Sequence, residues 1–312
     1  MSEASVCIVT YNSADDIEDC LHAVLRQSSP VRRIVIVDNA SCDDTCARIA
    51  ALDLGPRLTL LRNRVNNGFA GGQNQAIAQT DTPYVLVLNP DVRLHEHYLR
   101  ETIAELERQP RAGSACGQLL AGADPQRMDS AGLGLRATRQ AYDLGAGEPA
   151  SQWQAPLDVF GVSGAAAVYK RAMIEAIAEE RQFFDEDFFA YKEDVDAAWR
   201  ARHAGWTARY VPAARAWHHR GWKKGGRRAM PLFVRRHSYQ NRFFVLIKNE
   251  RLGWHWLWRL PLLAAAELAK LGYILLREPG LLACWPVILR LLPRMLRKRR
   301  AILKRAAAPF RQ

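Results

Sequence analysis

Carboxylate side chains stand directly after several apolar runs of this sequence. Asp38 follows the β-branched run 33–37, and Asn89-Pro90-Asp91 follows the apolar run 84–88. In a doubly wound α/β sheet, a carboxylate after the second strand commonly bonds a nucleotide ribose, although Asp38 could equally belong to the cap of the next helix. Mg²⁺ and Mn²⁺ prefer oxygen ligands, usually one or two carboxylates plus phosphate oxygens. Asp91 is therefore a candidate metal ligand, and the alternative is a plain turn after a strand.

A second group of acids lies in residues 183–196, among two pairs of phenylalanines. Glu193, Asp194 and Asp196 open a predicted helix 192–203, where the helix dipole favours negative charge. The dipole does not account for the aromatic pairs. An Asp beside aromatic walls is partly desolvated, which tends to raise its pKa and suits it to general-base catalysis.

Two further segments give weaker signals. Residues 66–74 (Asn-Asn-Gly-Phe-Ala-Gly-Gly-Gln-Asn) supply flexible backbone and amides before a predicted helix, and helix N-termini bind phosphate. The segment matches neither the Gly-x-Gly-x-x-Gly fingerprint nor the Walker loop. His218 and His219 follow a predicted strand, and a histidine there could complete a metal site, but a lone histidine is more often structural.

Short apolar runs alternate with helical patterns through most of the chain. The predicted strands cover 5–11, 33–37, 58–62, 84–88, 158–162 and 206–211, and the predicted helices cover 14–27, 43–52, 71–79, a segment from about 170, and 192–203. This alternation is typical of a parallel sheet with helices on both faces. Ligands of such sheets bind beyond the carboxyl ends of the strands, so the polar residues at these ends should meet at one crevice. The pattern is weaker from 113 to 156, where we expect a few strands and a loop.

The net charge of +12 is concentrated near the C-terminal end. Residues 251–312 contain thirteen Lys or Arg and two acids, Glu267 and Glu278. A groove for DNA or RNA would be built into the folded body, so we predict no nucleic-acid partner. Six scattered cysteines without a Cys-x-x-Cys pair disfavour a zinc site or a disulfide framework.

The C-terminal segment is apolar as well as basic. Residues 254–276 include three charges, and each mid-bilayer charge costs roughly 2.5–3.5 kcal/mol, which disfavours a spanning helix. Residues 281–292 are interrupted by Pro286. The pattern favours helices lying in the interface of an anionic membrane, with Trp254, Trp256, Trp258 and Trp285 at headgroup level. Helices packed on the main domain are the alternative.

Together and in this order, these motifs resemble glycosyltransferase family 2, whose inverting enzymes have the GT-A fold, and most closely its rhamnosyltransferase-like branch. The motifs are Val9–Ser13, Val37–Ser41, Asn66–Asn74, Leu88–Val92, Val162–Ala166, and Phe188–Asp196 with Trp199-Arg200 and Gly205-Trp206. The likeness covers about residues 4–250 and includes the family's basic, apolar tail. It implies an α/β fold of the Rossmann-like nucleotide-diphospho-sugar transferase type, with a GT-A domain over 1–250 and a membrane-associating tail of amphipathic helices over 251–312.

The resemblance also implies roles for individual residues. Asp194 would be the catalytic base, with Ser163, Gly164 and Glu193 on the acceptor side. Asp91 would be a ligand of Mg²⁺ or Mn²⁺, with His218 as a second ligand and His219 as the alternative. The family's first acid of Asp-x-Asp is Asn89 here, a departure shared by the rhamnosyltransferase-like branch, which implies modest metal affinity. The nucleotide sugar would contact Thr10, Tyr11, Asn12 and Asp38 at its base and ribose, Asn66, Gly72 and Asn74 along its diphosphate, and Asn89 and Asp91.

The implied activity is an inverting, metal-dependent transfer of single sugars. The preferred donor is dTDP-L-rhamnose, and the acceptor is a glycan or a lipid-linked glycan of bacterial cell-wall or polysaccharide synthesis. The Gln-x-x-Arg-Trp motif of the processive members is missing, which implies addition of a single sugar. The implied location is cytoplasmic, peripheral on the inner face of the plasma membrane. A UDP-sugar donor and a non-catalytic, membrane-associated nucleotide-binding protein are the alternatives. The sequence does not indicate an oligomeric state.

Overall fold

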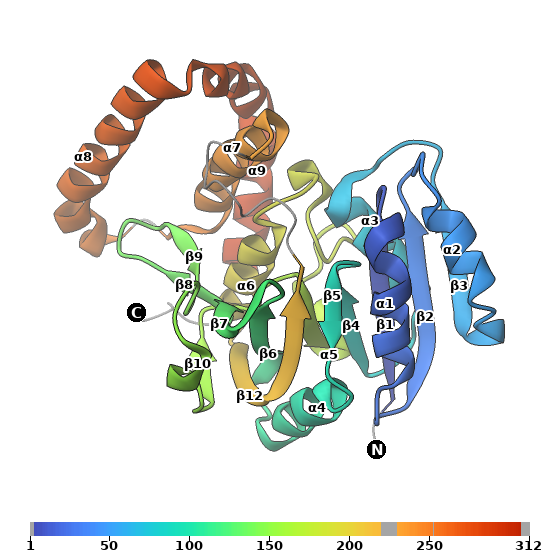
Figure 1. Ribbon diagram of the computed structural model, residues 1–312. Coiled ribbons are helices and arrows are strands. Elements are labelled where there is room, and N and C mark those ends of the chain that lie inside the picture. Colours follow the sequence, from blue (N-terminus) through green and yellow to red (C-terminus); the bar gives the residue numbers. More distant parts are fainter. Residues whose placement is uncertain (1–2, 220–229, 252, 307–312) are drawn as a thin grey trace.

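The computed structural model describes residues 3–219, 230–251 and 253–306. Most strands form one ten-stranded mixed sheet (Figure 1), whose main path runs β10-β12-β6-β11-β4-β1-β2-β3. The strands of the first part are β1 (Ala4–Thr10), β2 (Val31–Asp38), β3 (Leu58–Arg62), β4 (Tyr84–Leu88) and β5 (Val92–Leu94). The later strands are β6 (Ala112–Ala121), β7 (Asp124–Ser130), β8 (Leu133–Leu135), β9 (Ala141–Asp143), β10 (Leu157–Val159), β11 (Ala166–Lys170) and β12 (Thr207–His218).

The strands β1 to β4 pair in parallel, as the alternation of short apolar runs with helical patterns predicts. Successive side chains of a strand point to opposite faces, and two separate apolar cores result. Val6 and Ile8 pack into one core with helices α1 (Ala14–Leu25), α2 (Thr45–Ala51) and α4 (Tyr98–Arg108). Cys7 packs into the other with α3 (Gly68–Ala78), α5 (Arg171–Ile177) and α6 (Glu193–His203). The sheet is therefore covered on both faces, and the predicted α/β fold is confirmed.

The second half of the sheet is where sequence expectation and structure differ most. β11 runs antiparallel to both β4 and β6, and β12 runs parallel to β6. The strand expected over 206–211 continues to His218, with a register shift between Val211 and Arg215. That shift accommodates Pro212, since a proline lacks the N–H for ladder pairing and is tolerated at bulges. The longer strand carries His218 into the same region as Asp91.

Three helices complete the described chain: α7 (Leu232–Asn249), α8 (Trp254–Arg277) and α9 (Trp285–Arg305). Short 3₁₀ helices also occur at Gly55–Arg57 (η1), Ala150–Gln152 (η2), Glu186–Phe188 (η3) and Pro279–Cys284 (η5). α7 and α9 pack together against α6 in a third apolar cluster, whereas α8 stands away from the sheet (Figure 1). The stretch 281–292 is divided next to Pro286, because η5 ends at Cys284 and α9 begins at Trp285. Pro286 lies in the first turn of α9, where its missing N–H costs nothing. The helix continues through the basic cluster to Arg305.

Candidate active site

One cavity of about 430 Å³ brings together residues from distant parts of the chain. Seven residues predicted from the sequence line it, namely Asn89, Asp91, Ser163, Gly164, Glu193, Asp194 and His218. Its outer wall includes Tyr142 and Asp143 of the β8–β9 hairpin together with Val234, Arg235 and Ser238 of α7. The cavity thus lies between the carboxyl ends of the sheet strands and the C-terminal helices.

Asp194 stands at the first turn of α6 and borders the cavity. Its Oδ2 accepts a hydrogen bond from the Gly164 backbone N–H at 3.2 Å, and its Oδ1 accepts one from the Val195 N–H at 2.8 Å. Burial raises the pKa of Asp194 above its ordinary value, and the two backbone hydrogen bonds oppose that shift. A half-buried carboxylate with a raised pKa, held in a fixed orientation, is suited to accept a proton from a bound hydroxyl group.

Glu193 lies beside it and is buried, with 6% of its surface exposed. Its Oε2 makes no hydrogen bond within the described part of the chain. Burial, and then the negative charge of Asp194, raise the pKa of Glu193 well above its usual value. A buried acid that stays protonated can donate a hydrogen bond into the cavity.

The Glu193→Gln variant is expected to be more stable than wild type as the pH rises. The folded-state pKa of Glu193 is raised above the unfolded value near 4.5, so its favourable contribution is complete below that pH and is lost as pH rises through the folded pKa. Gln cannot ionise and escapes this loss. A gain of about 1 kcal/mol would appear as roughly 2–4 °C in Tm. Thermal melts from pH 4 to 8 measure this difference in Tm, with Glu175→Gln at an exposed position as the control. A Tm difference between Glu193→Gln and wild type that is constant with pH would contradict the raised pKa of Glu193.

The segment before α6 has a strained backbone. Phe189, Tyr191 and Lys192 have φ angles of 61°, 70° and 71°, in the left-handed region that L-residues rarely occupy. Such strain persists only where the surroundings impose it. Here the Asn241 amide of α7 donates to the carbonyls of Phe188, Ala190 and Tyr191 at 2.8–2.9 Å. Asn241 therefore holds the turn that delivers Asp194.

The same turn is locked to the start of α3. The Phe189 carbonyl accepts a hydrogen bond from the Ala70 N–H at 3.0 Å. Gly68 has a φ of +75°, and a Cβ there would lie 2.3 Å from the Phe189 carbonyl oxygen. Only glycine fits this approach, so the glycine-rich segment serves close packing between α3 and the turn.

A carboxylate–histidine–carboxylate chain also borders the cavity. Asp91 Oδ1 is 3.2 Å from His218 Nε2, and His218 Nδ1 is 2.9 Å from Oδ2 of the buried Asp129. A carboxylate on one ring nitrogen orients the imidazole and leaves the other nitrogen for a ligand. His219 is not among the residues that line the cavity; its ring packs over Gly122, and its backbone N–H donates to the Asp91 carbonyl.

The predicted nucleotide residues form a connected network at the ends of β1 and β2. Asp38 Oδ1 accepts hydrogen bonds from Thr10 Oγ1 at 2.9 Å and Ser41 Oγ at 2.6 Å. Asn12 has a φ of 52°, and its Oδ1 accepts a bond from the Cys42 N–H at 2.8 Å. Tyr11 is 54% exposed. These residues lie close to one another, but outside the residues that line the cavity.

Three residues predicted along the diphosphate have other partners in the structure. The Asn66 side chain accepts from the Gly68 N–H, and a Cβ on Gly72 would lie 2.8 Å from Val9. The Asn74 amide bonds the backbone of Phe183 and Phe184. Their contact with a diphosphate stays a prediction.

The sequence does not single out Asp129 or Asn241, which act through the contacts above. Asn39, which belongs to the Val37–Ser41 motif, donates to the Gly68 carbonyl and accepts from Asn63. Lys192 also borders the cavity, and burial lowers its pKa. The Asn after Asp38 was visible in its motif, whereas Asp129 lies in the weakly patterned stretch 113–156 and gave no signal.

Comparison with known proteins identifies the family. The model of glycosyl transferase family 2 matches residues 5–178, more than half of the chain, and the chain belongs to this family. It is a glycosyltransferase.

Its relatives agree with the resemblance to the rhamnosyltransferase-like branch. The N-acetylglucosaminyl-diphospho-decaprenol L-rhamnosyltransferase of Mycobacterium tuberculosis is 28% identical over 282 residues, covering 82% of this chain and 87% of the relative. The poly-β-1,6-N-acetyl-D-glucosamine synthase of Staphylococcus epidermidis is 22% identical over 215 residues, covering 68% of this chain and 49% of that protein.

Solved structures share the fold. A mannosyltransferase from Pyrobaculum calidifontis, in complex with GDP-Man and Mn²⁺, has a TM-score of 0.57 at 20% identity, covering 97% of this chain and 85% of that one. GalNAc-T7, with UDP, GalNAc and Mn²⁺, has a TM-score of 0.63 at 12% identity, covering 80% of this chain and about half (49%) of that one. The GT-A fold with added C-terminal helices is confirmed.

Proposed function

We propose that this enzyme is an inverting, metal-dependent, non-processive glycosyltransferase that moves L-rhamnose from dTDP-L-rhamnose. The observation that carries the proposal is a single cavity that is lined by Asp194 and also by Asp91 and His218. Asp194 would supply a base for an acceptor hydroxyl, and Asp91 with His218 would suit a metal-bound diphosphate. Transfer needs these two functions on opposite sides of the reacting carbon.

In the proposed reaction, Asp194 accepts the proton of an acceptor hydroxyl as its oxygen attacks the anomeric carbon. The Gly164 N–H keeps the carboxylate oriented during this step. The new carbon–oxygen bond forms on the face opposite the leaving nucleoside diphosphate, whose bond to the sugar breaks. One displacement inverts the anomeric configuration and needs no covalent sugar–enzyme intermediate.

The residues at Asp91 fit a divalent metal. Two neighbouring ligands of an ion with bonds of about 2.1 Å at right angles lie about 3 Å apart, close to the 3.2 Å between Asp91 Oδ1 and His218 Nε2. The described residues contain no group of three or more His, Cys, Asp or Glu that could hold a metal, so the remaining ligands would be diphosphate oxygens and water. Mg²⁺ or Mn²⁺ held there would offset the charge developing on the leaving diphosphate. We assign the second ligand to His218 rather than His219.

The donor and acceptor are proposed from the rhamnosyltransferase relative, whose name specifies L-rhamnose and a diphospho-decaprenol acceptor. The acceptor here would be a glycan or lipid-linked glycan of cell-wall or polysaccharide synthesis. The structural relatives are complexes with UDP and with GDP-Man, so a UDP-sugar donor is the second candidate.

A panel of nucleotide sugars tests the proposal. Purified full-length protein is incubated with Mn²⁺ or Mg²⁺ and with dTDP-L-rhamnose, UDP-sugars or GDP-mannose, and release of nucleoside diphosphate is measured with and without a lipid-linked acceptor. We expect acceptor-dependent release of dTDP. If only a UDP-sugar supports release, the rhamnose assignment is replaced by that donor. If no donor supports release, the proposed glycosyltransferase activity is contradicted.

We propose further that the C-terminal helices hold the enzyme at the inner surface of the plasma membrane. α8 exposes a large apolar surface, with Trp258, Leu268 and Leu276 at 87%, 69% and 82% exposure. Basic residues of α9 would add attraction to anionic lipid. Within the described residues one segment, Pro279–Arg305, has the length and composition of a spanning helix. The side chains of Trp254 and Trp256 lie outside the described part.

Replacing Leu268, Leu275 and Leu276 of α8 with Gln should weaken binding to anionic liposomes at least tenfold. Burying a leucine side chain stabilises by about 1.5–3 kcal/mol, and all three are exposed in the free protein, so Tm should change little. Co-sedimentation with neutral and anionic liposomes, with Leu25→Gln on α1 as control, provides the measurement. High salt should loosen wild type only in part; unchanged binding by the triple variant would exclude α8 as the membrane contact.

A further inference from the structure

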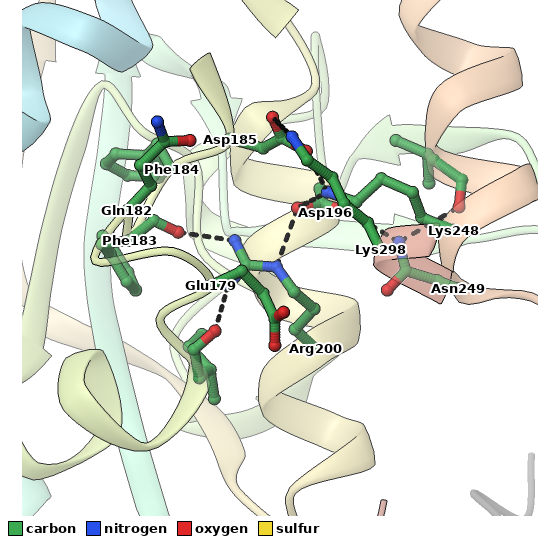
Figure 2. Close-up of polar contacts among 12 residues, drawn as sticks. Glu179, Gln182, Phe183, Phe184, Asp185, Asp196, Arg200, Lys248, Asn249 and Lys298 are labelled. Carbon is green, nitrogen blue, oxygen red and sulfur yellow. Dashed lines mark hydrogen bonds and ion pairs between the residues drawn. The ribbon is translucent and has the colours of Figure 1, made fainter. Parts of the chain in front are cut away.

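A buried network of opposite charges joins the C-terminal helix α9 to the helix that carries the proposed base (Figure 2). Lys298 Nζ of α9 contacts Asp185 Oδ1 at 2.5 Å and Asp187 Oδ2 at 2.7 Å. Lys248 Nζ of α7 contacts Asp185 Oδ2 at 2.6 Å and Asp196 Oδ2 at 2.8 Å. Asp185 therefore lies between two lysines from two different helices.

The network extends into α6. Asp196 also accepts bonds from Arg200 Nε and from the Asn249 amide, both at 2.8 Å. Arg200 in turn donates to the carbonyls of Ile177 and Phe183. Asp196 is fully buried and lies two residues after Asp194, so the network fixes the first turn of the helix that carries the base.

All the central members are buried, which makes their pairing necessary. Lys248, Lys298 and Asp185 are 1–5% exposed. Burial alone would raise the pKa of Asp185, but the ammonium groups of Lys248 and Lys298 hold it well below its usual value. Removing one partner from a buried ion pair leaves an uncompensated charge, which is strongly unfavourable.

The acids of this network lie in the segment that leads to the cavity. Asp185 caps η3 by accepting from the Asp187 N–H at 3.0 Å. η3 ends at Phe188, and the strained turn at Phe189–Lys192 follows before Asp194. A displacement of Asp185 and Asp187 would be transmitted to this turn. Its residues keep their strained backbone conformation only while the surrounding structure imposes it.

We propose that Lys298 is a positioning residue for catalysis: it fixes the segment 185–192, so that α9 completes the active site instead of serving only as a membrane anchor. Lys298 does not line the cavity and touches no reacting group. It acts through Asp185 and Asp187 on the orientation of Asp194. The inference rests on the proposed function for its kinetic readout.

The same contacts bear on how α9 meets a membrane. Inserting α9 across a bilayer would separate Lys298 from Asp185 and Asp187, and Asp187 would also lose its ion pair with Arg294 of α9. Arg299 and Arg305 of α9 also donate to the carbonyls of Ile247 and Ala178. α9 therefore stays on the protein while α8 provides the exposed apolar surface.

The test compares Lys298→Met with two matched variants. Lys298→Arg keeps the charge at the same place, and Lys304→Met removes the same charge from an exposed position of the same helix. With dTDP-L-rhamnose as the donor, we expect Lys298→Met to lower kcat at least tenfold while the donor KM stays within about twofold. Lys298→Arg should recover a substantial part of kcat, and Lys304→Met should equal wild type. Equal kcat for wild type and a folded Lys298→Met would overturn the proposal.

A second readout does not depend on activity. Hydrogen–deuterium exchange should increase in peptides covering 183–196 of Lys298→Met, while peptides of β1, β2 and β4 keep wild-type protection. If Lys298→Met does not fold, Asp187→Asn decides, because it weakens the contacts of Asp187 with Lys298 and Arg294, both on α9, and leaves the Asp185–Lys248 pair. Wild-type kcat and exchange in that variant would overturn the proposal. If wild type turns over no donor but exchange in 183–196 still depends on Lys298, the proposed activity fails and the positioning role stands.

Discussion

Asp194→Asn should reduce turnover by roughly 10²–10⁴-fold while donor binding changes little. Asn keeps the size of the side chain and its place at the first turn of α6, but it cannot accept a proton. Initial rates and the donor dissociation constant, measured on the same preparations, separate the two effects. The exposed Asp53→Asn, which makes the same chemical change far from the cavity, should behave as wild type. Near-normal turnover in Asp194→Asn would remove this residue from the mechanism.

The same residue sets the expected pH dependence. Burial raises the pKa of Asp194, and a base is active only when deprotonated. Activity should therefore fall as the pH drops through this raised pKa, at a pH above that of an ordinary aspartate. The acidic limb should be absent from the residual activity of Asp194→Asn.

Asp91→Ala should lower activity by about 10²-fold or more and abolish stimulation by Mn²⁺ and Mg²⁺. A metal ion contributes several kcal/mol to stabilising charge on a leaving group, and Asp91 is the acidic side chain proposed to hold it. Donor binding should weaken as well, because the diphosphate shares the ion. Metal titrations of activity and of donor binding in wild type and variant measure both effects. Full wild-type activity in the presence of a chelator would show that the metal assignment is wrong.

The sequence predicts the first half of the fold well because its strands are short apolar runs that alternate with helical patterns. The run 84–88 is fully buried, and the runs at 58–62 and 84–88 give the bounds of β3 and β4 without tertiary information. The polar residues after β1, β2 and β4 are expected at one crevice because parallel strands end at one edge. The structure brings Asn89 and Asp91 to the cavity together with Asp194 of a helix start, whereas Tyr11, Asn12 and Asp38 lie outside the cavity lining.

β12 shows what local pattern cannot supply. Its later part, residues 212–218, begins with Pro212 and shows no regular alternation of polar and apolar residues. A register shift and pairing with β6 and β5 decide its conformation. Asp129 gave no signal for a similar reason, since its contact with His218 spans 89 residues of sequence. Such pairings depend on the tertiary arrangement.

The basic residues of the tail show the same limit. In the sequence, Lys298 belongs to a basic cluster that predicts a membrane-binding surface. In the structure its side chain is buried against Asp185 and Asp187. Periodicity cannot distinguish a buried lysine with distant partners from an exposed one. The predicted boundary near residue 250 stays a prediction, and α9 makes its ion pairs with residues on the other side of it.

The anomeric configuration of the product tests the central claim most directly. Wild-type enzyme is incubated with a donor that supports turnover and with its acceptor, and the configuration of the new glycosidic bond is determined by NMR. A single displacement with Asp194 as the base predicts a product whose configuration is opposite to that of the donor. A product that retains the donor's configuration would contradict the account, because it would require two displacements or a different route.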